Sequence, residues 1–153
     1  MKPKFNDNYK GLKCRVYLVR EGDSDEIIKL NNSKDVYNLV KDELVNSDRE
    51  MLVSVMLAVN NQLIGVETVS LGSIYATTML PRDVFKSAIL ANAVGIILCH
   101  NHPSGDLTPS GEDIHHTKLI TDAGKLLGIK VLDHIIVSNK GFYSLADHCE
   151  IKA

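Results

Sequence analysis

The feature that most constrains the fold is an uninterrupted apolar run, AVGIILC, at residues 93–99. A strand without polar alternation offers no face to water, so other elements must cover both of its faces. A loop rich in proline, glycine and serine follows, from His100 to Pro109. The run therefore predicts a strand within a mixed central sheet that has helices against its faces, as in α/β domains.

Other segments show helix and strand patterns around this run. Apolar residues at helical spacing predict helices at residues 33–45, 81–92 and 110–127. Apolar and β-branched runs predict strands at residues 12–20, 50–58, 62–71 and 130–138. Ser33 and Ser110 are expected to cap helices, Asn60-Asn61 to form a hairpin turn and Gly128 to end the last helix. The strands at 12–20 and 130–138 are candidates for sheet edges, through which a homo-oligomer can form.

Length and composition indicate one globular domain spanning residues 1–153, with the core of the site at about 50–150. Of the 153 residues, 44% are hydrophobic and 24% charged, and no repeat or linker divides the chain. No apolar run approaches the roughly 20 residues of a membrane span, and the N-terminus lacks the apolar core of a signal peptide. Cys14, Cys99 and Cys149 are odd in number and far apart, which argues against a disulfide framework. We therefore expect a cytoplasmic protein without membrane partners.

The most specific spacing lies where the central strand gives way to the last predicted helix. His100 and His102 are two residues apart on an extended segment, so both imidazoles can reach one ion. Asp113 is three residues after Ser110, and its carboxylate can turn back toward the strand end. Two nitrogens and one carboxylate would give Zn²⁺ three protein ligands and leave a fourth position for water, as in catalytic sites. The alternatives without metal are a loop turn at His102, a helix cap at Ser110 and a first-turn acid at Asp113.

Hydrolysis at such a site also needs a base and a donor to the oxyanion. Glu50 is the candidate base, because it stands at the head of the strand predicted at 50–58, which is expected to neighbour residues 93–99. Glu67 and Glu43 are rivals that spacing does not exclude. Ser110 is expected to donate its hydroxyl to the oxyanion of a tetrahedral intermediate.

Two histidines and one cysteine outside the proposed ligand set are interpreted as structural. His116 is expected to pack in the core or beside the ligands, because it shares a helical stripe with Leu119, Ile120, Ala123 and Leu127. His134 is expected to make a structural hydrogen bond. Cys99 is expected to be a small buried residue rather than a nucleophile or ligand.

The spacing His-x-His, seven residues, Ser, two residues, Asp resembles that of the JAMM (MPN+) metalloproteases and matches it at every position. The longer string HNHPSGDLTPSGEDI, with LPRDVFKSAILANAVGIILC before it and VLDHIIVSNKGFYSL after it, resembles the JAB domain of RadC-like proteins over about residues 50–150. The resemblance implies a JAB/MPN fold of cytidine-deaminase-like architecture, with zinc on His100, His102 and Asp113. It also implies that Glu50 is the family's upstream glutamate.

Two features depart from this family pattern. Ala58 and Val59 stand where the family usually has an acidic residue, a change that does not touch the metal ligands. The chain ahead of Glu50 is short for the helix-hairpin-helix domain of longer RadC proteins and lacks its glycine-rich hairpin pattern. No helix-hairpin-helix domain is therefore expected, which weakens the transfer of a DNA-repair role.

The combined prediction is a zinc-dependent metallohydrolase that acts on a peptide or isopeptide bond. The alternative is a non-catalytic RadC-like interaction module that binds nucleic acid or protein in DNA repair. A base deaminase is excluded, because the chain lacks both its His/Cys-x-Glu element and its later Pro-Cys-x-x-Cys element.

The charge of the chain predicts weak binding to duplex DNA. Non-specific affinity comes chiefly from Lys and Arg neutralising phosphates, and this chain has 17 basic against 19 acidic residues. We expect a Kd no tighter than roughly 10⁻⁵ M near physiological salt. Fluorescence anisotropy with labelled duplex measures this affinity, and submicromolar binding that survives about 200 mM salt would favour the interaction module.

Overall fold

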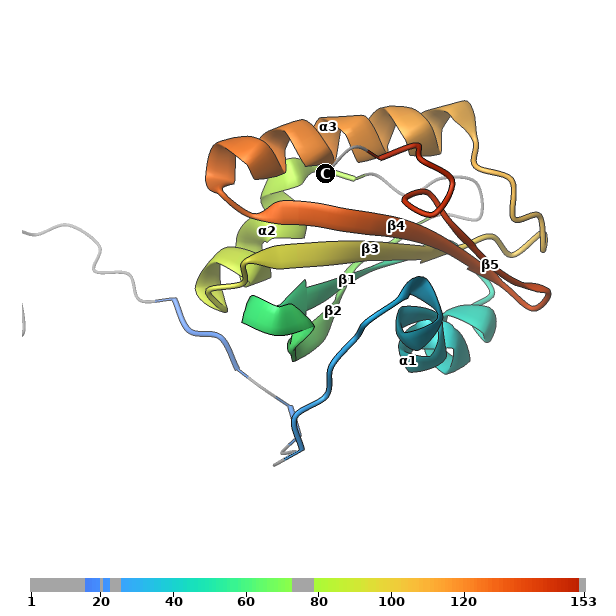
Figure 1. Cartoon of the computed structure of the whole chain (residues 1–153). Coiled ribbons are helices and arrows are strands. Elements are labelled where there is room, and N and C mark those ends of the chain that lie inside the picture. Colours follow the sequence, from blue (N-terminus) through green and yellow to red (C-terminus); the bar gives the residue numbers. More distant parts are fainter. Residues whose placement is uncertain (1–15, 20, 23–25, 73–78, 152–153) are drawn as a thin grey trace, which may run out of the picture.

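The computed structural model describes residues 16–19, 21–22, 26–72 and 79–151, which contain a single α/β domain (Figure 1). Within these residues, helices lie on both faces of a five-stranded mixed sheet, as predicted. None of the helices in the described part of the chain is long and apolar enough to cross a membrane. The elements are α1 (Ser33–Val45), β1 (Met51–Leu57), a 3₁₀ turn (Val59–Asn61), β2 (Leu63–Leu71), α2 (Pro81–Leu90), β3 (Gly95–Asn101), α3 (Gly111–Leu127), β4 (Lys130–Ser138) and β5 (Gly141–Ser144).

β3 is the middle strand of the sheet, whose order is β2-β1-β3-β4-β5. Every residue of β3 is buried, which confirms the expectation from its apolar sequence. It pairs antiparallel with β1 and parallel with β4, and α3 is the crossover that a parallel pair needs. The end of β3 therefore opens into the loop that leads to the first turn of α3.

Alternating side chains divide the core into one layer on each face of the sheet. The α1-side core contains Val36, Val40 and Leu44 of α1 against alternate residues of β1, β3 and β4. The α2/α3-side core contains Phe85 of α2 and Ile120 of α3 against the strand residues whose side chains point to the other face, such as Leu52 of β1 and Leu98 of β3. Figure 1 shows α1 on one face of the sheet and α2 and α3 on the other. Burial of each such aliphatic or aromatic side chain contributes about 1.5–3 kcal/mol.

Residues that tolerate positive φ angles mark two of the predicted chain reversals. Asn60 and Asn61 have φ angles of 61° and 58°, which confirms the turn between β1 and β2. Gly128 has a φ angle of 71° and ends α3 in the left-handed conformation, as predicted.

Three expectations about individual elements are corrected by the structure. Asn32, not Ser33, caps α1, because its side chain accepts from a backbone N–H in the first turn. Residues 130–138 form an inner strand, since the unpredicted β5 pairs with them, and β2 and β5 are the edges of the described sheet. Residues 16–19 form no strand, and the rest of the strand predicted at 12–20 lies outside the described residues.

Gly124 sets the close approach of α3 to the start of β4. A Cβ atom at this position would lie 2.4 Å from the carbonyl oxygen of Ile129 and 3.1 Å from the ring of Phe85. We expect Gly124→Ala to lower the free energy of unfolding by about 1–3 kcal/mol, the usual cost of overpacking. Urea denaturation measures the change. Gly111→Ala is the matched control, because a Cβ there meets no atom within 4 Å, and equal stability loss in both variants would contradict the close-approach argument.

Candidate metal centre

Three of the predicted ligands converge where β3 ends and α3 begins. His100 lies near the end of β3, His102 directly follows the strand, and Asp113 lies in the first turn of α3. The Nε2 atoms of the two histidines are 2.9 Å apart. Asp113 Oδ1 lies 3.2 Å from His100 Nε2, and Asp113 Oδ2 lies 3.4 Å from His102 Nε2. The structure therefore brings His100, His102 and Asp113 together in a cluster that can hold one metal ion.

The spacing of these atoms fits a tetrahedral ion. Ligand bonds of about 2.0–2.1 Å in a tetrahedron place the ligand atoms about 3.3–3.4 Å from one another. The two Nε2 atoms are 2.9 Å apart, and they lie 3.2 and 3.4 Å from different oxygens of the Asp113 carboxylate, so each separation is near this value. Two imidazole nitrogens and a carboxylate are ligands that zinc accepts. The donor set is therefore compatible with zinc without rearrangement of the backbone.

The other ring nitrogen of His102, Nδ1, has a hydrogen-bond partner outside the cluster. His102 Nδ1 lies 2.7 Å from the carbonyl oxygen of Asp106, which can only accept a hydrogen bond. The proton of a neutral His102 is therefore on Nδ1, and the lone pair of Nε2 faces the cluster. This outer hydrogen bond orients the ring as it does for metal-bound histidines.

A capping box holds Asp113 in place at the start of α3. Ser110 is the N-cap, as predicted, and its hydroxyl accepts from the backbone N–H of Asp113 at 3.1 Å. In return, the backbone N–H and the hydroxyl of Ser110 both donate to Asp113 Oδ2 at 2.7 Å. The Ser110 hydroxyl must therefore turn from this carboxylate in order to donate to a substrate oxyanion, and that role stays a prediction.

The cluster strongly favours the ionised form of Asp113. Burial by itself raises the pKa of Asp113, but the rings of His100 and His102, which donate to it when protonated, and the hydrogen bond from Ser110 outweigh burial and hold the pKa well below its usual range. The hydrogen bond to Asp113 raises the pKa of His102, and the nearby negative charge of Glu50 adds to this effect. The carboxylate is thus ready to bind a cation at neutral pH.

The strand register brings Glu50 closer to the cluster than its two rivals. Leu52 of β1 pairs with His100, so Glu50, two residues earlier, continues the same face of β1 alongside His102. Glu67 pairs with Ser54, further along β1 and on the strand beyond it. Glu43 belongs to α1 and accepts a hydrogen bond from Thr68, on the opposite face of the sheet. The geometry favours Glu50, whose catalytic role stays a prediction.

Sequence comparison places this geometry in a known family. The chain matches the RadC-like JAB domain over residues 30–150. It belongs to this family. The match confirms the resemblance inferred from the motif and extends it to include α1, and the five-stranded sheet with three helices is consistent with the JAB/MPN fold.

Curated relatives of the RadC-like domain are longer than this chain. A UPF0758 protein of Caldanaerobacter subterraneus subsp. tengcongensis is 43% identical over 137 residues, or 84% of this chain. A UPF0758 protein of Desulfitobacterium hafniense is 42% identical over 139 residues, or 89% of this chain, and one of Moorella thermoacetica is 47% identical over 118 residues, or 77%. The matched regions cover 58%, 61% and 52% of these relatives, respectively. The chain thus spans little more than half of their length.

Asn101, between the two histidines of this RadC-like domain, holds the backbone around Glu50. Its side-chain oxygen accepts from the backbone N–H of Met51 at 2.7 Å, and its amide nitrogen donates to the carbonyl oxygen of Arg49 at 3.0 Å. Asn101 is 2% exposed, so these bonds also satisfy its buried amide. The sequence analysis missed this residue, because its partners lie on a strand whose register the sequence does not specify.

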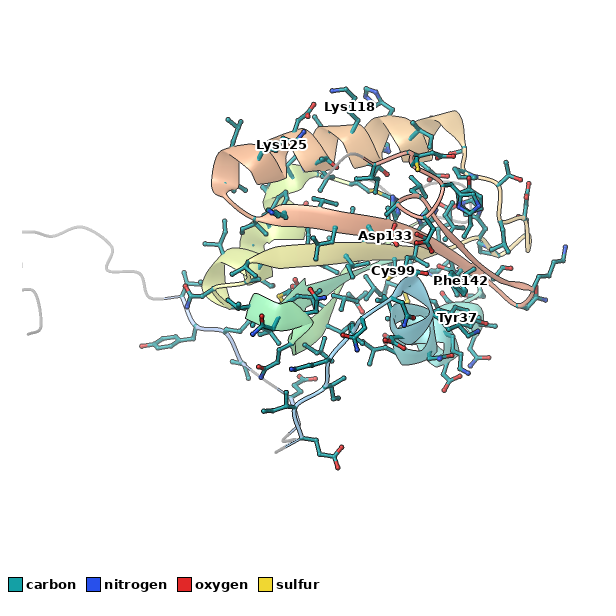
Figure 2. All side chains as sticks on the ribbon, in the orientation of Figure 1. Tyr37, Cys99, Lys118, Lys125, Asp133 and Phe142 are labelled. Atoms are coloured by element: carbon teal, nitrogen blue, oxygen red, sulfur yellow. The ribbon has the colours of Figure 1, made fainter. Side chains whose placement is uncertain are left out.

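His134 and Cys99 take the structural positions predicted for them. His134 is fully buried and contacts His100 through one ring nitrogen and Thr117 through the other. Burial lowers the pKa of His134 well below its ordinary value, and the proximity of His100 lowers it further. Cys99 lies in the α1-side core, on the side of β3 toward α1 (Figure 2). Burial raises the pKa of its thiol, so it is a poor nucleophile.

His116 does not lie on the buried stripe of α3, contrary to the prediction. It is only half-buried, and the buried positions of the helix are Thr117, Ile120, Thr121 and Gly124. Leu119, expected on the same stripe, is 44% exposed. The apolar spacing of this helix misled the prediction, because two threonines and a glycine occupy three of its four buried positions.

Proposed function

We propose that this domain is a zinc-dependent metallohydrolase that cleaves an amide bond, of the peptide or isopeptide type. The observation that carries the proposal is the convergence of His100, His102 and Asp113, whose ligand atoms all lie within 4.8 Å of one another. Three protein ligands leave a coordination position for water or substrate, which distinguishes catalytic from structural zinc sites. The membership in the RadC-like JAB family agrees with this assignment.

When bound, zinc would polarise the substrate carbonyl and lower the pKa of the attacking water. Glu50 is proposed to accept a proton from this water and to transfer it to the nitrogen of the leaving amine. Ser110 is proposed to donate its hydroxyl to the oxyanion. The C–N bond of the amide breaks, and the products are a carboxylic acid and an amine.

A hollow beside the loop that joins His102 to α3 offers room for a substrate chain. It has a volume of about 590 Å³ and is lined in part by Leu107, Pro109, Ile114 and Tyr143. Pro109 directly precedes the N-cap Ser110, so the hollow adjoins the loop that joins the metal ligands. The lining also includes Asp106, Thr108 and Glu150, so it offers a peptide both apolar and polar contacts.

The proposal is tested by metal analysis together with hydrolysis. The purified protein is assayed with a ubiquitin-like isopeptide-linked pair and with linear peptides, before and after removal of metal by a chelator and after return of zinc. We expect cleavage that is lost with the metal and restored by zinc. A zinc-containing protein that cleaves none of these substrates would favour the non-catalytic interaction module.

A further inference from the structure

We propose that Thr117 and His134 are positioning residues that hold the proton of His100 on Nδ1 and so leave its Nε2 free to bind the metal. The three side chains form a continuous chain of hydrogen bonds behind the cluster. Thr117 Oγ1 lies 2.6 Å from the backbone carbonyl oxygen of Asp113 and 2.5 Å from His134 Nδ1. His134 Nε2 then lies 2.7 Å from His100 Nδ1. In a chain of this kind, the position of the proton on one side chain fixes the position of the proton on the next.

The direction of each bond follows from the first one. A carbonyl oxygen can only accept, so the single hydroxyl proton of Thr117 goes to Asp113. The Thr117 oxygen must then accept from His134, which places the proton of His134 on Nδ1. The unprotonated Nε2 of His134 accepts from His100, so the proton of His100 is on Nδ1. The unprotonated nitrogen of His100 is then Nε2, which lies 2.9 Å from His102 Nε2 and 3.2 Å from Asp113 Oδ1, and a cation held there would satisfy the lone pairs that face one another.

The surroundings of His134 make this assignment stable. Its side chain is fully buried, which favours the neutral imidazole with one donor and one acceptor. Thr117 is 3% exposed and His100 is 2% exposed, so water has little access to the bonds. Reversal of one bond in such a chain leaves either two protons or two lone pairs facing each other, at the cost of a buried unsatisfied group.

The same chain of hydrogen bonds connects two proposed ligands from different elements, Asp113 of α3 and His100 of β3. Thr117 lies one helical turn after Asp113, so the turn of α3 that supplies the carboxylate also fixes the proton on the ring from β3. β4 contributes the linking residue His134. The inference requires His100 to be a ligand, as in the proposed function, but it does not depend on hydrolysis.

The test compares Thr117→Val, which keeps the shape of the side chain without its hydroxyl, with Thr117→Ser, which keeps the hydroxyl. Long-range ¹H–¹⁵N NMR on metal-free protein reports the tautomers of His100 and His134, and competition with a chromophoric chelator measures zinc affinity. We expect wild type and Thr117→Ser to hold His100 as the Nδ1–H tautomer. Thr117→Val should show mixed tautomers and bind zinc about 10- to 100-fold more weakly, the usual effect of removing an outer hydrogen bond.

Other results separate this inference from its rivals. An unchanged His100 tautomer and zinc affinity in Thr117→Val would overturn the proposal. Equal weakening in Thr117→Ser and Thr117→Val would also overturn it, because the loss would then follow from packing rather than from the hydroxyl. His134→Phe, which keeps a ring without nitrogen, should weaken zinc binding at least as much as Thr117→Val. Because neither readout uses a substrate, failure to find hydrolysis would count against the proposed function alone.

Discussion

Replacement of His100 and His102 by alanine is expected to abolish zinc binding, from about one ion per chain in the wild-type protein. The two Nε2 atoms and the Asp113 carboxylate form the described cluster, and one carboxylate on its own is a weak site for zinc. Elemental analysis of the purified proteins measures the difference. The loss should be complete at concentrations of zinc that saturate the wild-type protein.

A matched control removes two histidines that lie outside the cluster. His115 and His116 are neighbours on α3 whose ring centroids are 5.8 Å apart, and His115 is exposed. The variant His115→Ala/His116→Ala should keep its zinc. Equal zinc content in the wild-type protein and the His100→Ala/His102→Ala variant would show that the ligand set is wrong.

Glu50→Gln is expected to reduce hydrolysis by about 10²–10⁴-fold while zinc content stays unchanged. The amide has the shape of the carboxylate but cannot accept the proton of the attacking water. Both quantities are measured on the same preparation, by elemental analysis and by the rate of amide cleavage. A fall in kcat with zinc retained identifies a proton acceptor rather than a ligand.

Glu67→Gln is the control for this substitution. Glu67 lies on β2, one strand further from β3 than Glu50, and it was a rival in the sequence analysis. We expect Glu67→Gln to keep its activity. Full activity in Glu50→Gln together with an inactive Glu67→Gln would transfer the role of base to β2.

The metal ligands were predictable because they are close in sequence. His100, His102 and Asp113 lie on one strand end, one loop and one helical turn, so the period of a strand and the position of a helix cap were enough to bring them together. Central placement of β3 was predictable for a similar reason, since seven apolar residues in succession leave no face for solvent.

The parts that were not predicted depend on distant pairing. The bonds of Asn101 to Arg49 and Met51 require the register of β1 against β3, and a shift by one residue would point the side chain to the other face. The partnership of Thr117 with His134 requires the height of α3 above β4, which Gly124 sets rather than the apolar stripe. Short strands such as β5 also escape prediction, because four residues carry too little pattern.

The two layers of the core differ in how freely their side chains can be substituted without disturbing the candidate metal site. The α1-side core, with Val36, Val40 and Leu44, holds none of the three groups that form the cluster, and Asp113 belongs to α3 on the other face of the sheet. Substitutions that preserve volume under α1 alter chiefly the stability of the domain. The α2/α3-side layer has less freedom, since a shift of α3 there also moves Asp113. Attempts to raise the stability of the domain without disturbing the candidate metal site should therefore begin with the side chains beneath α1.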